Sequence, residues 1–146
     1  MKTKKFAYVG FLMLFASHIL FAGDYKREIP MEEATKAYCA EWFVETGLIL
    51  HKFVYNSDGT YGYYYKDAEK PNYSGTFKIE KSWKDSEGNT WLIVGLSHPG
   101  GPWSLNKINE DGNVRERISR SIRDNLPAEI DPKDGSYARF ILKKIE

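Results

Sequence analysis

The side chains best suited to catalysis or metal binding are few in this sequence. Beyond residue 23 it contains two histidines, His51 and His98, which lie far apart, and one cysteine, Cys39. A structural zinc site needs clustered ligands at short spacing, and the G-x-S-x-G turn of a common class of serine hydrolases is absent. The sequence therefore predicts no metal site, no cofactor and no enzymatic activity.

Four arginines form the one basic cluster of the sequence: Arg115, Arg117, Arg120 and Arg123. Arg115 and Arg117 share one face of a predicted strand, so the cluster offers a docking point for an anion or for a phospholipid headgroup at an envelope or membrane surface. The alternative is a solvated outer face whose ion pairs contribute little. Nearby acidic side chains support that alternative and argue against nucleic acid as a partner. These acids are Glu110, Asp111 and Glu116.

Aromatic side chains are the second feature suited to binding, and they make up 15% of the sequence. Rings with a polar tip line many carbohydrate and lipid sites, although they also fill ordinary cores. His51 is in phase with Phe53 and is expected to be an inward, hydrogen-bonded histidine, whereas His98 lies in a predicted loop and is the better candidate for a functional imidazole. The candidate ligand site consists of Tyr63, Tyr65, Tyr73, Trp91, His98 and Trp103.

A helix is predicted before the strands that carry these residues. Pro30, followed by Glu32 and Glu33, suits a helix N-terminus. Apolar residues then recur at intervals of three and four, and Gly47 suits the end of a helix. The sequence predicts a helix over about residues 31–45. The apolar positions are Met31, Ala34, Tyr38 and Trp42.

From residue 47 onward the hydrophobic period becomes that of strands. Gly59, Gly88 and Gly112 mark tight turns between neighbouring strands. In an up-and-down meander such turns lie at one end, and the longer connections gather at the other end, where binding loops are common. The fold class predicted is mainly β, an antiparallel meander closing into a small barrel of about seven strands, with one N-terminal helix. The predicted strands are 48–56, 60–66, 75–83, 90–97, 103–109, 114–118 and 137–145.

Two of these strands have distinctive patterns. Phe77, Ile79 and Trp83 alternate with polar residues, which predicts that all three face the interior. Residues 91–96 are apolar on both faces, which is typical of a central strand or of one that the helix covers on its second side.

The first 23 residues have the layout of a secretory signal peptide, with a basic head and a long apolar run. An uncleaved membrane anchor is the alternative. Residues 24–146 are expected to form a single domain that is exported, either periplasmic or secreted. Removing the segment takes three lysines from 21 basic residues and leaves 18 against 20 acidic ones, a net charge near −2. With Cys39 as its only cysteine, the chain forms no internal disulfide.

Residues 42–119 resemble the short lipocalin-like domains of exported bacterial proteins. In that group a first strand is followed by a D-G-T turn and then by a G-T-W or G-T-F strand. Here the turn is Asp58-Gly59-Thr60, and Gly75-Thr76-Phe77 occupies the place of the second motif. No Gly-x-Trp stands where true lipocalins begin their first strand, and the predicted helix precedes the barrel instead of following it. The resemblance implies a barrel with an apolar interior and often a small hydrophobic ligand.

Two functional hypotheses follow. The first is an exported lipocalin-like module that binds a small apolar or amphipathic ligand in the barrel mouth near Tyr73, His98 and Trp103. The second is a non-enzymatic envelope structural or protein-interaction domain with a filled core. An interior void of about 300 Å³ or more, lined by aromatic side chains, would favour the first.

Overall fold

The computed structural model describes residues 26–45, 51–98 and 102–142. Within these ranges no helix is both long and apolar enough to span a bilayer. The elements are β1 (Arg27–Glu28), α2 (Met31–Tyr38), β2 (Glu41–Val44), β3 (His51–Tyr55), β4 (Thr60–Tyr65), β5 (Tyr73–Lys84), β6 (Thr90–Leu96), β7 (Trp103–Ile108), β8 (Val114–Arg120), the 3₁₀ turn η2 (Arg123–Asn125) and β9 (Ala138–Leu142).

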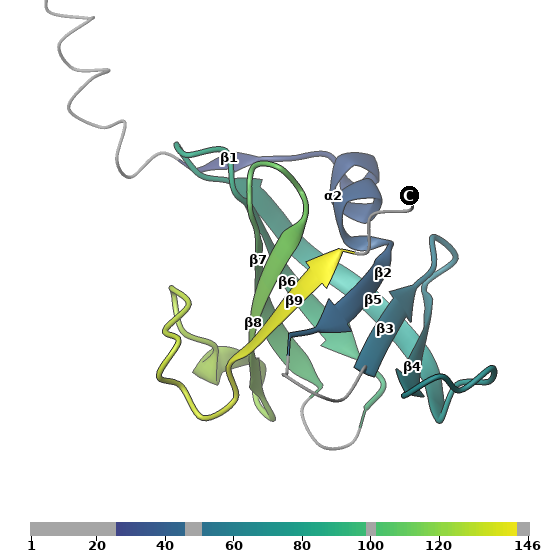
Figure 1. Ribbon diagram of the computed structural model, residues 1–146. Coiled ribbons are helices and arrows are strands. Elements are labelled where there is room, and N and C mark those ends of the chain that lie inside the picture. Colours follow the sequence, from purple (N-terminus) through teal and green to yellow (C-terminus); the bar gives the residue numbers. More distant parts are fainter. Residues whose placement is uncertain (1–25, 46–50, 99–101, 143–146) are drawn as a thin grey trace, which may run out of the picture.

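Eight of these strands close into an antiparallel barrel (Figure 1). From β2 to β9 each strand pairs with the next one along the chain, and β9 pairs back with β2. The short strand β1 adds to one edge of β5. The predicted fold class is confirmed, with eight barrel strands instead of about seven. Closure leaves the barrel strands with no long free edge that could pair with another chain.

The additional strand, β2, comes from the segment that the sequence predicted as the second half of a helix. The helix prediction for residues 31–45 is wrong beyond Tyr38, because Trp42 pairs with Phe53 on β3 and with Leu142 on β9. Trp42 still keeps a link to the helix, since its indole Nε1 donates a 2.9 Å hydrogen bond to the Tyr38 carbonyl. The predicted helix end at Gly47 lies outside the described residues.

The two ends of the barrel differ, as the turn pattern predicted. Helix α2 lies at the end where the tight turns join the strands, and residues 121–137 lie at the opposite end (Figure 1). The turn glycines Gly59, Gly88 and Gly112 adopt φ values of 87°, 82° and 72°, a region that favours glycine. Ala34 and Tyr38 of α2 are fully buried, so the helix plugs its end of the barrel.

The barrel has an inner core and a second apolar cluster on its outer face. The inner core is built around Tyr38, Trp42 and Phe140. The outer cluster comprises Trp83, Trp91 and Leu105, with Ile93, Leu126 and Ile130 packed against it. Because Leu126 and Ile130 belong to residues 121–137, this connection covers the outer face of β5, β6 and β7. It is this connection, and not the helix, that covers the second side of the apolar strand β6.

The prediction that Trp83 faces the interior with Phe77 and Ile79 is wrong. The register of β5 against β6 shifts between Ile79 and Lys81. A bulge of this kind inserts one residue and reverses the alternation beyond it. Trp83 therefore faces outward and stacks on Trp91, with ring centroids 6.0 Å apart and an interplanar angle of 6°.

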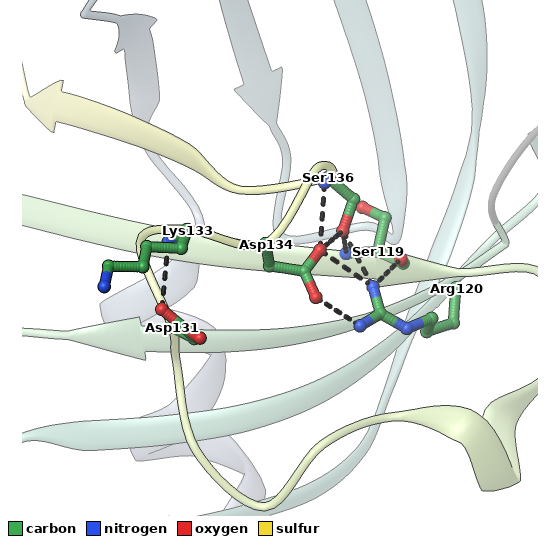
Figure 2. Close-up of polar contacts among 6 residues, drawn as sticks. All are labelled: Ser119, Arg120, Asp131, Lys133, Asp134 and Ser136. Atoms are coloured by element: carbon green, nitrogen blue, oxygen red, sulfur yellow. Dashed lines mark hydrogen bonds and ion pairs between the residues drawn. The ribbon is translucent and has the colours of Figure 1, made fainter.

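Polar contacts hold the start of the long connection to its end. Figure 2 shows that the Arg120 guanidinium donates hydrogen bonds to the Asp134 carboxylate. Its Nη1 also donates to the Ser136 hydroxyl at 2.9 Å. The backbone N–H of Ser119 donates to the same hydroxyl at 3.0 Å. The pairing holds the pKa of Asp134 far below its usual range. The contacts fix the connection against the rim of the barrel.

Candidate functional site

A cavity opens at the end of the barrel opposite the helix. Its main part has a volume of about 400 Å³, and an adjoining hollow has a volume of about 290 Å³. We call the two together the mouth cavity, because they share Phe53, Tyr61 and His98. Such volumes are typical of small-molecule sites. The main part is lined by Val44, His51, Phe53, Tyr61, Tyr63, Tyr73 and His98, and the hollow adds Leu96, Arg117, Ser119 and Ser136.

The register of β3 and β4 builds the aromatic wall of the mouth cavity. Phe53 pairs with Tyr63, and Tyr55 pairs with Tyr61, so alternate residues of both strands face inward. The rings of Phe53 and Tyr63 lie 5.0 Å apart. Gly75 on β5 leaves room for this wall, since a Cβ there would lie 2.9 Å from the Tyr61 ring. This contact gives a physical reason for the glycine of the G-T-F motif.

Two hydroxyl groups of the wall are held by hydrogen bonds, whereas the buried Tyr61 hydroxyl has no hydrogen-bond partner among the described residues. The Tyr63 hydroxyl is bonded to Nδ1 of His51, and the Tyr73 hydroxyl donates to the Ser97 carbonyl at 3.1 Å. Burial raises the pKa of Tyr63, and burial together with the neighbouring Tyr73 raises that of Tyr61. These phenols are therefore neutral at physiological pH, and the wall offers apolar surface with few polar points.

Arg117 on β8 is the one arginine or lysine among the described residues that line the mouth cavity. Its guanidinium lies 4.9 Å from the centre of the Phe140 ring and 5.5 Å from that of Phe53. Burial, followed by the charge of Arg115, lowers the pKa of Arg117 despite an opposing effect of Tyr55, yet an arginine stays charged. Arg117 Nε has no hydrogen-bond partner, and Tyr55 is near without meeting hydrogen-bond geometry.

Arg115 lies deeper, toward the helix, and is fully buried. It donates to Oδ1 of Asn106 at 3.0 Å and to the Tyr38 hydroxyl at 3.4 Å. Four aromatic rings surround the guanidinium, with centroids between 4.0 and 5.4 Å away. They belong to Tyr38, Trp42, Tyr55 and Phe140.

The prediction that Arg115 and Arg117 form a surface face is wrong, because both point into the barrel. A fully buried Arg115 cannot take part in a membrane or envelope contact. The reason is that apolar Ile118, on the opposite face of β8, is buried on the outer side of the barrel against Leu105 of the outer cluster. The other two arginines of the cluster have partners, Arg120 on Asp134 and Arg123 on Glu80.

The structure brings together some of the predicted ligand residues and separates others. Tyr63, Tyr73 and His98 line the mouth cavity, and Tyr65 lies at its rim with its ring edge against His51. Trp91 and Trp103 do not reach the cavity. Trp91 belongs to the outer cluster, and Trp103 lies beside Gly95 on the outer face.

Several lining residues were missed by sequence reasoning, notably Val44, Phe53 and Arg117. Phe53 and His51 share the inward phase of β3, which was a usable signal. Val44 lies on the strand that was taken for helix, so the sequence pattern offered no signal there. Arg117 is polar on a strand whose apolar residues face outward, which inverts the usual interpretation.

A second hollow, about 550 Å³ in volume, lies on the outer face beside Trp83 and Trp91. The two indoles stack on each other, and the Trp91 Nε1 donates to Asp85 at 2.8 Å. Lys26, Lys81 and Lys107 lie over the rings. This hollow is charged, and its rings are already covered, so the mouth cavity is the better candidate site.

Among residues 26–45, 51–98 and 102–142, no group of three or more histidine, cysteine, aspartate or glutamate side chains is placed to hold a metal ion. Comparisons with protein-family models, with curated proteins and with solved structures find no match for this chain. The function must therefore be argued from the geometry of the mouth cavity.

Proposed function

We propose that the protein is an exported, lipocalin-like, non-enzymatic binding module that takes a small apolar or amphipathic molecule into the mouth cavity. The observation that carries this proposal is an aromatic-lined cavity at one end of a barrel whose other end is plugged by α2. A ligand there would remove apolar ring surface from water, at about 25 cal/mol per Å². Export is supported by the signal-like residues 1–23, which lie outside the described ranges.

The test is binding of N-phenyl-1-naphthylamine, a neutral dye that fluoresces in apolar sites. We expect saturable binding by the unmodified chain and at least a tenfold weaker affinity for Val44→Phe, which places a larger side chain in the cavity. Val54→Phe is the matched control, because Val54 lies on the outer face of the neighbouring strand, opposite Glu41. Absence of dye binding, or equal losses in both variants, would contradict the proposal.

A protein-interaction domain is the second candidate. Ile141 on the outer face of β9 is 41% exposed and lies opposite Phe43 of β2. If this surface docks a partner, Ile141→Asp will abolish recovery of that partner by crosslinking in the native host. Dye binding by the mouth cavity together with unchanged crosslinking would favour the first proposal.

A further inference from the structure

The interior of the barrel is cationic. Arg115 and Arg117 both point inward from β8, and among the described residues that line the mouth cavity there is no aspartate or glutamate. Cations removed from water are strongly disfavoured unless they are paired or hydrogen-bonded. Each arginine therefore needs an explanation for what stabilises its charge.

Arg115 has part of such an explanation within the fold. Its Nη1 donates to Asn106 at 3.0 Å and to the Tyr38 hydroxyl at 3.4 Å, and aromatic rings surround the guanidinium, although its buried Nε and Nη2 have no hydrogen-bond partner among the described residues. Arg115 is not among the described residues that line the mouth cavity. A ligand in that cavity is therefore not expected to reach Arg115, whose charge is stabilised by Asn106, Tyr38 and the rings.

Arg117 differs because it borders the cavity. Across the described residues it takes part in no ion pair, and its Nε lacks a hydrogen-bond partner although that atom is buried. It contacts the faces of Phe53 and Phe140 and lies near Tyr55. Arg117 lines the hollow that continues the main cavity, together with Leu96 and Ser119. A cation so placed has an apolar cavity on one side and open donor capacity.

We infer that the occupant of the mouth cavity is an apolar acid, whose carboxylate lies against the Arg117 guanidinium while its apolar part contacts Phe53 and Tyr61. The inference rests on the proposed function and adds the charge of the ligand. Guanidinium and carboxylate match in geometry, and charge-assisted hydrogen bonds are about twice as strong as neutral ones. A cationic ligand is excluded from the same position by repulsion.

Three probes that share one skeleton separate charge from apolar contact. They are 4-phenylbutyrate, 4-phenylbutan-1-ol and 4-phenylbutylamine, titrated by calorimetry at pH 7.5 into the full exported chain. We expect the acid to bind about tenfold or more tightly than the alcohol, and the amine to bind more weakly than the alcohol. Equal affinities for acid and alcohol would overturn the inference and leave the proposed function standing. Failure of all three would count against both.

Variants of Arg117 assign the effect to this residue. Arg117→Met should lower the affinity for the acid about tenfold and leave that for the alcohol unchanged, which also reports an intact cavity. Arg117→Lys should retain part of the preference for the acid, because it keeps the charge. Arg139→Met, which removes an arginine from the outer face of β9, should change neither affinity. If Arg117→Met keeps the full preference for the acid, the inference is wrong.

Discussion

The two ends of this barrel each contain an inward-facing arginine, and the surroundings of the two arginines differ. At the helix end, Arg115 is enclosed by aromatic rings and bonded to Asn106. At the mouth, Arg117 is two residues further along the same strand and the same face, yet it borders a cavity. The same type of side chain is thus part of the core where a helix closes the barrel, and borders a cavity where no helix does.

The difference also separates stability from function along each strand. On β2, Trp42 is fully buried beneath the helix, whereas Val44 lines the mouth cavity. On β8 the order is Arg115, Arg117 and Ser119, from the packed end to the rim. Residues near the helix should control unfolding, and residues near the mouth should control ligand affinity. Mutations at the two ends test whether stability and ligand affinity are divided in this way.

Removal of the Trp42 ring is expected to have the largest effect. Trp42→Ala should lower the free energy of unfolding by about 3–5 kcal/mol, since it leaves a void in a packed core. Val44→Ala on the same face should cost only about 1 kcal/mol, because it borders space that is already open. Urea unfolding followed by circular dichroism measures both. Equal losses would show that the two ends do not differ in packing.

A smaller loss is expected when Arg115 loses its acceptor. Asn106→Ala should lower the free energy of unfolding by about 2 kcal/mol, because a charged hydrogen bond is lost and the guanidinium remains buried. Ser119→Ala, at the mouth end of β8, should change it by about 0.5 kcal/mol or less. Chemical denaturation of the two variants side by side provides the measurement. A neutral Asn106→Ala would mean that the aromatic rings alone stabilise Arg115.

The smallest effect concerns acid sensitivity at the rim. Arg120 holds the pKa of Asp134 below its unfolded value of about 3.9. The pair therefore stabilises the fold above that pH, and the contribution is lost as the pH falls below it. The difference in thermal midpoint between the unmodified chain and Asp134→Asn should narrow from pH 6 to pH 3. Asp131→Asn, whose carboxylate accepts the Lys133 N–H in the same segment, is the control (Figure 2). A difference in thermal midpoint that does not change with pH would contradict a stabilising ion pair between Arg120 and Asp134.

The architecture could be predicted from the sequence because turns and strand periods are local signals. Gly59, Gly88 and Gly112 fixed three hairpins and, through the meander, the end where the longer connections lie. The helix boundary was missed because Trp42 is spaced four residues from Tyr38, which suits a helix as well as an inward strand position. Whether Trp42 is in a helix or in a strand is decided by pairing partners far along the chain, here Phe53 and Leu142.

The candidate site was predicted only in part, for a related reason. An alternating pattern distinguishes two faces of a strand but does not say which face is inside. On β8, apolar Ile118 points outward opposite Leu105 of the outer cluster, against which the connection 121–137 packs, so Arg117 points inward. A bulge after Ile79 reversed the face of Trp83 in the same way. Tyr63 and Tyr73 were found because β4 has neither complication and Tyr73 precedes the bulge on β5, while His98 follows the end of β6 in a connection that the turn residues predicted.

Chemical-shift mapping tests the division between the two ends most directly. The ¹⁵N-labelled chain would be titrated with 4-phenylbutan-1-ol while backbone amides and indole N–H groups are observed. We expect the largest shifts at Phe53, Tyr63 and Ser119, and little change at Ala34 or at the Trp91 indole. Largest shifts at Ala34, or at the Trp91 indole on the outer face, would contradict a ligand site in the mouth cavity.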